Sequence, residues 1–95
     1  MSTYTSKDGI EFDSESEELS ELSEQSYQNK EVTSLQRLIQ ALQVMDEAGV
    51  KFLPGAGHDE LYGPSASELT YEQIKKLYSL TWYVNSDTDT FYTFV

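Results

Sequence analysis

The apolar positions in the middle of the chain recur with the period of a helix. They are Leu35, Leu38, Ile39, Leu42 and Met45. Their spacing fits the 3.6-residue turn, and Thr33 with Gln36 forms a capping box just before them. Gly49 stands where a left-handed residue commonly ends a helix. The pattern therefore predicts a helix over residues 34–48.

A second helix is predicted from its start signals. Thr70 and Gln73 form another capping box, and Leu69 can pack on Ile74 as a hydrophobic staple. The apolar face then continues along Ile74, Leu77 and Tyr78. These signals predict a helix over residues 70–80.

The C-terminal residues have the pattern of a β-hairpin. Two β-prone runs, 82–84 and 91–95, flank residues 85–89, which favour a turn. Near the N-terminus, the turn signal at residues 7–9 precedes alternating Ile10 and Phe12, which indicates a short strand that could join the same sheet.

Residues 50–66 are predicted to form a long connector. Pro54-Gly55, Gly57 and Gly63-Pro64 interrupt any regular pattern there. Loops of this length in a small domain are often functional, which makes the connector a place to look for binding residues.

Together these elements predict one α+β domain over residues 1–95. Two to three helices would pack on a small antiparallel sheet that includes the C-terminal hairpin, with residues 32–95 as the compact core. Residues 1–31 would be either a solvated acidic element or a partly disordered segment. Within that segment, Asp13 or Ser14 could cap a helix whose narrow apolar stripe is formed by Leu19, Leu22 and Tyr27.

The charge of the chain restricts the partners that it can attract. Seventeen acidic residues face six basic ones, which gives a net charge of -11, and there is no Cys. Nucleic acids and anionic membranes attract basic proteins, so we expect neither as a direct partner. With no apolar run of about 20 residues and no secretion signal at the N-terminus, we expect the cytoplasm, or the host cytoplasm if a phage encodes the chain.

The densest charge lies in the predicted acidic helix. Its acids are Glu15, Glu17, Glu18, Glu21 and Glu24. Over about 15 Å of helix they would place one charge per roughly 3 Å, close to the phosphate spacing of a DNA strand. A basic groove that binds phosphates could accept such a helix, which is the physical basis of DNA mimicry. The alternative is an ordinary solvated face, or a flexible tail that only gives solubility.

Further candidate partner-binding residues lie in the connector and in the hairpin turn. They are Asp59, Glu60, Tyr62, Asp87 and Asp89, with Tyr62 as an exposed aromatic anchor. The alternation of Asn85, Asp87 and Asp89 lacks the rest of a calcium loop, so these are expected to be turn residues. His58 has no second His and no Cys beside it. We therefore expect no metal, no cofactor and no catalytic residue.

These observations favour a non-enzymatic binding protein. In size and charge alone, the chain is similar to phage anti-defence proteins, including DNA mimics and anti-CRISPR proteins, and to nuclease-immunity proteins. That similarity implies an inhibitor that blocks a basic protein, with nucleic-acid-binding proteins as the expected class. The alternative is a protein-interaction adaptor with an acidic solubilising tail and a loop-based or apolar binding face.

Overall fold

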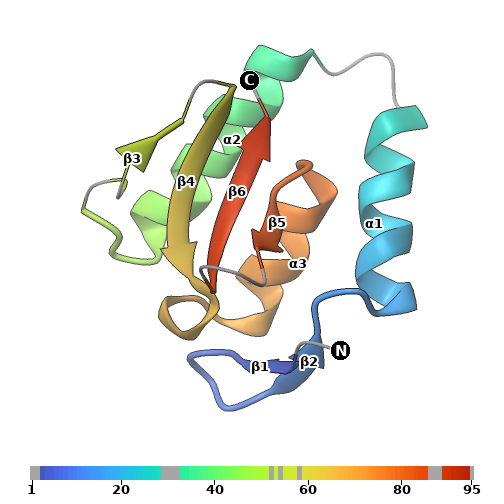
Figure 1. Ribbon diagram of the computed structural model, residues 1–95, viewed down its shortest axis with the longest axis vertical. Coiled ribbons are helices and arrows are strands. Elements are labelled where there is room, and N and C mark those ends of the chain that lie inside the picture. Colours follow the sequence, from blue (N-terminus) through green and yellow to red (C-terminus); the bar gives the residue numbers. More distant parts are fainter. Residues whose placement is uncertain are drawn as a thin grey trace.

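The computed structural model describes residues 3–28, 33–51, 53, 55–57, 59–85 and 89–94, and gives no side-chain placement for residues 26–28 and 34. The predicted contribution of Tyr27 therefore lies outside the described side chains. Within the described part, three α-helices and six strands form an α+β fold, as predicted (Figure 1). In chain order the elements are β1 (Thr3–Thr5), β2 (Glu11–Asp13), α1 (Glu17–Gln28), α2 (Ser34–Glu47), β3 (Gly55–Ala56), β4 (Glu60–Ser65), the 3-10 helix η1 (Ala66–Glu68), α3 (Tyr71–Ser79), β5 (Tyr83–Asn85) and β6 (Thr90–Phe94).

Helix α2 starts and ends as its sequence predicts. The Thr33 hydroxyl accepts the Gln36 N–H at 3.1 Å, and the Gln36 side chain accepts the Thr33 N–H at 2.9 Å. At the other end, Gly49 has φ +90°, a conformation that favours glycine. Two backbone bonds, from Gly49 N–H to the Asp46 carbonyl and from Val50 N–H to the Met45 carbonyl, close the helix in a Schellman motif.

Helix α3 has the predicted cap at its start and an unpredicted one at its end. Thr70 and Gln73 form the expected capping box. The end is again a Schellman motif, with Thr81 N–H on the Tyr78 carbonyl and Trp82 N–H on the Leu77 carbonyl. Thr81 occupies the left-handed position with φ +66°. A β-branched residue is strained there. Because this position holds Thr81 and not glycine, the sequence carries no glycine signal for the end of α3.

Helix α1 is an ordered part of the domain. Ser16, rather than Asp13 or Ser14, caps it, because the Ser16 hydroxyl accepts the Leu19 N–H at 3.4 Å. Leu19 is fully buried, and α1 packs along α3. The described part of the acidic segment is therefore helical and contributes Leu19 to the core.

The main sheet is antiparallel, with the strand order β3-β4-β6-β5. The predicted C-terminal hairpin is its β5–β6 pair. Two strands were missed: the predicted connector over residues 50–66 contains β3 and β4, and β4 pairs with β6 through a register shift between Tyr62 and Ser65. The reason is Gly63-Pro64, which breaks a strand pattern in the sequence but sits at this irregularity in the fold. Gly63 is also required by contact, because a Cβ there would lie 3.0 Å from the Trp82 ring.

Helices α2 and α3 cover one face of this sheet, and none of the described helices crosses the other face (Figure 1). The covered face carries Phe91, whose ring centroid lies 6.0 Å from that of Tyr78 on α3. The fully buried core is completed by Trp82, Leu69, Ile74 and Leu77. None of the helices in the described part of the chain is long and apolar enough to cross a membrane.

The sequence suggested that an N-terminal strand could join the main sheet, but β1 and β2 lie outside it. β1 and β2 pair with each other in a separate two-stranded sheet. This hairpin is attached to α3 by Asp8, whose carboxylate accepts the Tyr71 N–H at 3.1 Å. A carboxylate is favoured at a helix N-terminus. A hydrogen bond from the Ser6 hydroxyl lowers the pKa of Asp8, and Phe12 packs between Tyr4 and Tyr71.

The docking of α1 can be tested at its buried contact. We expect Leu19→Ala to lower the free energy of unfolding by about 2 to 4 kcal/mol, since it removes a fully buried side chain and leaves a cavity. Leu42→Ala on α2 is the matched control, because Leu42 is 39% exposed, and it should cost less than about 1 kcal/mol. Urea unfolding measures both. Equal, small losses would contradict the docked position of α1.

Candidate functional site

Three of the predicted acids form an outward row on α1. Glu17, Glu21 and Glu24 are exposed and follow one another at i, i+4 and i+7, on the side opposite the buried Leu19. The helix contains no Lys or Arg. Over this row three charges span about 10 Å, which is sparser than the density expected if all five acids shared one face. We call Glu17, Glu21 and Glu24 the acidic row.

The other two acids of this segment point elsewhere. Glu18 accepts a hydrogen bond from the Tyr71 hydroxyl of α3 at 3.3 Å. Burial, together with the nearby Glu18 carboxylate, raises the pKa of Tyr71. Glu15 precedes the helix, and its N–H bonds to the Asp13 carboxylate at 2.9 Å. Its side chain lines a groove between α1 and the sheet.

The acids predicted in the connector and in the hairpin turn do not gather with α1. Asp59 is exposed just before β4, and Glu60 is half-buried at the start of β4, opposite Phe94. Asp89 is exposed beside Thr90, at the other end of β6, with φ +57° and its N–H on the Asn85 carbonyl. These residues therefore lie at opposite ends of the sheet. Asp87 and His58 lie outside the described residues.

Tyr62 was predicted to be an exposed loop anchor, and this was wrong. It lies within β4, is half-buried, and pairs directly with Tyr92 of β6. Tyr83 of β5 pairs with Tyr92 from the other side. Directly opposed residues of antiparallel strands share a face, and Tyr92 follows Phe91, which packs on α3. The three tyrosines therefore form a row across the sheet, on the face opposite the one that α2 and α3 cover.

The groove between α1 and this tyrosine row was missed from the sequence. We call it the α1–sheet groove; its volume is about 290 Å³. It is lined by Ser14, Glu15, Ser20, Ser23, Tyr78, Tyr83, Val84 and Tyr92. No local motif marks it, because the residues come from four segments that meet only in the fold: the start of α1, α3, β5 and β6.

Tyr78 holds the wall of this groove in place. Its hydroxyl donates to the Ser14 carbonyl at 3.0 Å and accepts the Val84 N–H at 3.3 Å. The same residue therefore joins α3, the edge strand β5 and the segment that leads into α1. Burial raises the pKa of Tyr78 to about 12, against a smaller opposing effect of the bond from Val84.

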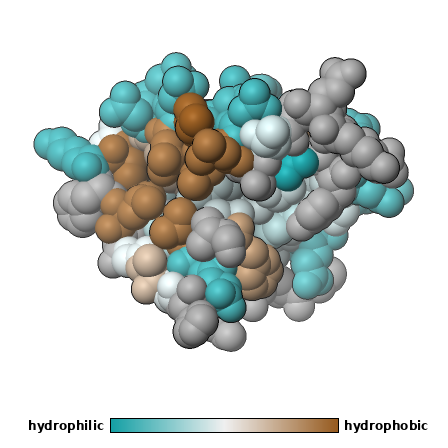
Figure 2. Space-filling view, turned by 90° about the horizontal axis from the view of Figure 1, so that it is seen from above, coloured by the Kyte–Doolittle hydropathy of each residue, from teal (hydrophilic) through white to brown (hydrophobic). Residues whose placement is uncertain are grey.

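A second surface is apolar and lies on α2. The helix turns Ala41, Val44 and Met45 into the core, so that part of the predicted apolar stripe faces solvent. Leu35 is 64% exposed, Ile39 48% and Leu42 39%. We call these three residues the α2 apolar face. Figure 2 shows hydrophobic side chains gathered on the end of the molecule seen from above.

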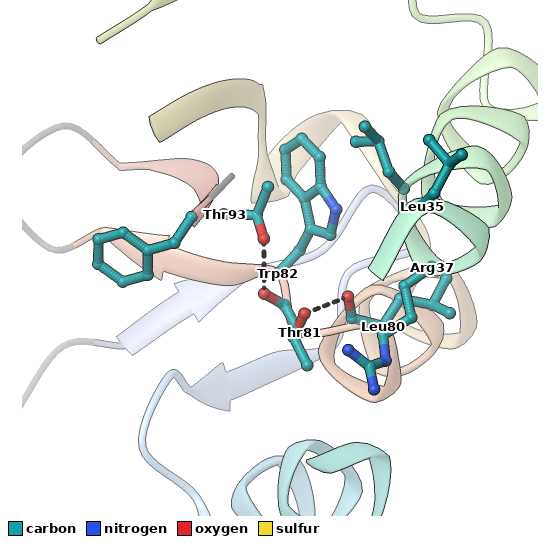
Figure 3. Close-up of a pocket in the computed structure, with 8 residues that line it drawn as sticks. Leu35, Arg37, Leu80, Thr81, Trp82 and Thr93 are labelled. Atoms are coloured by element: carbon teal, nitrogen blue, oxygen red, sulfur yellow. Dashed lines mark hydrogen bonds between the residues drawn. The ribbon is translucent and has the colours of Figure 1, made fainter. Parts of the chain in front are cut away.

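A pocket of about 240 Å³ adjoins the α2 apolar face. Figure 3 shows Thr93 on one side of the Trp82 indole and Leu35 on the other, with Leu80 next to Thr81. The Thr93 hydroxyl donates to the Thr81 carbonyl at 3.0 Å. The strained Thr81 therefore sits in the wall of a pocket, and this segment is fixed to β6.

Among the residues that the structure describes, no three His, Cys, Asp or Glu side chains converge as metal ligands. The chain matches no protein family model, and no curated protein or solved structure is significantly similar to it.

The role of Tyr78 can be tested by removing its hydroxyl. We expect Tyr78→Phe to cost about 1 to 3 kcal/mol at pH 7, because the buried Val84 N–H loses its partner. Urea unfolding measures the loss. Tyr62→Phe, which removes a half-buried hydroxyl, is the matched control and should change stability little. A Tyr78→Phe protein as stable as the wild type would contradict this role.

The raised pKa of Tyr78 also predicts a pH dependence. Below about pH 10 both states keep the proton, so the stabilisation is fully present. Between about pH 10 and pH 12 the unfolded chain releases the proton while the folded chain retains it. Stability should therefore fall by about 2 to 3 kcal/mol over this window. Tyr78→Phe should lose that part of the fall, whereas identical pH profiles would contradict the assignment.

Proposed function

We propose that this protein is a non-enzymatic inhibitor that occupies a cationic surface of a basic partner protein. The partner class is nucleic-acid-binding proteins, whose phosphate-binding grooves suit a row of carboxylates. The single observation that supports this most is the acidic row. Glu17, Glu21 and Glu24 face solvent on a helix that has no basic residue and is anchored by Leu19.

The anchoring matters because it makes the charge usable. Carboxylates on a flexible tail must be ordered when the partner binds, and that ordering costs free energy. A docked helix holds its carboxylates in place beforehand. Opposite charge then raises the association rate, while a few desolvated contacts set the lifetime of the complex.

The negative charge of the protein also indicates which molecules it would not bind. With a net charge of -11, it repels DNA, RNA and anionic membranes. It competes with nucleic acid for the partner instead of binding nucleic acid itself. This is the mode of a DNA mimic, and it requires neither a cofactor nor a catalytic group.

A second candidate function is an adaptor that docks through the α2 apolar face. The observation that favours it is the exposure of Leu35, Ile39 and Leu42 beside a pocket walled by Trp82 and Leu80. Large apolar side chains grouped on a surface commonly mark a protein contact. In this mode the acids would serve solubility.

The inhibitor proposal is tested by reversing the acidic row. We expect Glu17→Lys, Glu21→Lys and Glu24→Lys together to weaken partner binding on the order of 100-fold, since three contacts become repulsive. The immobilised protein is exposed to lysate at low and at high salt, and retained proteins are identified by mass spectrometry. Wild type should retain basic nucleic-acid-binding proteins at low salt and release them at high salt.

The matched control reverses three other exposed acids, Glu11, Asp46 and Glu47, and so makes the same change in net charge. It should keep most of the binding. If both triple variants lost binding, the change in net charge alone would account for the loss, whatever the position of the acids. Retention by the α1 triple variant, or capture that does not respond to salt, would refute the inhibitor proposal.

The adaptor is tested on α2. We expect Leu35→Gln with Ile39→Gln to weaken binding about 10-fold or more if this face docks the partner, with little change in stability because both sites are exposed. Ile10→Gln, at a residue that is 43% exposed on the separate N-terminal hairpin, is the matched control. The same pull-down measures binding, and full retention by the α2 variant would exclude this mode. Deleting the first 28 residues is unsuitable, because Phe12 and Leu19 belong to the core.

A further inference from the structure

The α1–sheet groove combines features that a general acidic surface lacks. It is bounded on one side by the start of α1 and on the other by the tyrosines of β5 and β6. Tyr83 and Tyr92 present two rings, 6.0 Å apart between centroids and tilted by 53°. Glu15, Ser20 and Ser23 line the same groove and bring one carboxylate and two hydroxyl groups to its lining residues.

The electrostatics of this lining favour a cation. The faces of aromatic rings carry negative potential and attract ammonium and guanidinium groups. The described lining adds one carboxylate and contains no Lys or Arg, so nothing positive within it competes for that position. Burial keeps the Tyr78 hydroxyl protonated well above neutral pH, so the negative charge at the groove mouth comes from Glu15.

The size and the polar groups select among cations. A volume of about 290 Å³ is at the small end of ligand sites and suits one side chain better than a cofactor. Guanidinium is planar and carries five N–H donors, and it stacks on aromatic faces more readily than ammonium does. Two rings, two serine hydroxyls and a carboxylate match that set of donors.

We propose that the α1–sheet groove binds an arginine side chain of the basic partner. This inference rests on the proposed function and deepens it, because it places one specific contact beside the acidic row. The acidic row would attract the partner at long range. The groove would then hold one guanidinium against the exposed parts of the Tyr83 and Tyr92 rings, with Glu15 as its ion-pair partner.

The test compares two neutralised carboxylates of the same segment. Full-length protein labelled with nitrogen-15 is titrated at low salt with a blocked tetra-arginine peptide and, separately, with a blocked tetra-lysine peptide. We expect Glu15→Gln to weaken binding of the arginine peptide about 3- to 5-fold, and Glu11→Gln, with the same charge change at an exposed residue outside the groove and the acidic row, less than about 2-fold. Tyr92→Leu should weaken it by a similar 3- to 5-fold, whereas Tyr92→Phe, which keeps the ring, should not.

The outcomes separate the groove from the broader proposal. Arginine peptide that binds more tightly than lysine peptide and shifts the signals of Ser20, Ser23 and Tyr83 supports the groove. Equal effects of Glu15→Gln and Glu11→Gln, with no effect of Tyr92→Leu, would overturn it. In that case a salt-sensitive loss of peptide binding in the triple variant of Glu17, Glu21 and Glu24 would leave the inhibitor proposal standing. A wild-type protein that binds neither peptide would overturn the groove, while the pull-down would still decide the inhibitor proposal.

Discussion

The position of the acidic helix beside the sheet depends on one buried hydroxyl. The side chain of Tyr78 bonds at once to the Ser14 carbonyl and to the Val84 N–H. Val84 lies on β5, the last strand of the sheet order, and an open edge of this kind exposes unpaired backbone groups. By satisfying one of these groups and by holding the segment before α1, Tyr78 sets the acidic helix beside the sheet. The position of the carboxylates is thus a consequence of backbone hydrogen bonding.

The fold has to hold a helix whose own charges oppose it. Like charges at i and i+4 or i and i+3 repel by a few tenths of a kcal/mol per pair, and α1 contains no basic residue to offset them. Burial of Leu19 stabilises the helix by about 2 kcal/mol, which exceeds the repulsion of Glu17–Glu21 and Glu21–Glu24 together. One side of α1 can therefore be given over to carboxylates only because the opposite side is fixed in the core. The same short helix therefore contributes to the stability of the fold on one side and carries the exposed carboxylates on the other.

Local signals in the sequence carried much of the fold. The capping boxes at Thr33 and Thr70 and the glycine at position 49 placed two helices to within a residue or so, because each signal is a backbone hydrogen bond made by neighbours in the chain. Features that depend on distant residues were missed or misplaced. Gly63-Pro64 has the sequence of a loop, but in the fold it lies in β4, which pairs with β6. Thr81 ends α3 without a glycine, next to the buried Trp82 indole. The orientation of α2 about its own axis places Met45 against Gly63. The period of the apolar positions along α2 gives no information about this contact.

The candidate sites divide along the same line. The acidic row follows from helical spacing, and so Glu17, Glu21 and Glu24 could be named from the sequence. Glu15 and Glu18 were grouped with them, yet the fold sends one to a groove and the other to Tyr71.

The tyrosine row exists only through strand register, since Tyr62, Tyr92 and Tyr83 come from three separate strands. Charge alone would give attraction without geometry. Aromatic faces beside a carboxylate favour the planar guanidinium group of Arg over the ammonium group of Lys. A protein this acidic can attract many basic surfaces, so the selectivity of the proposed inhibitor would have to come from such short-range contacts. The α1–sheet groove is where charge and rings meet in this fold.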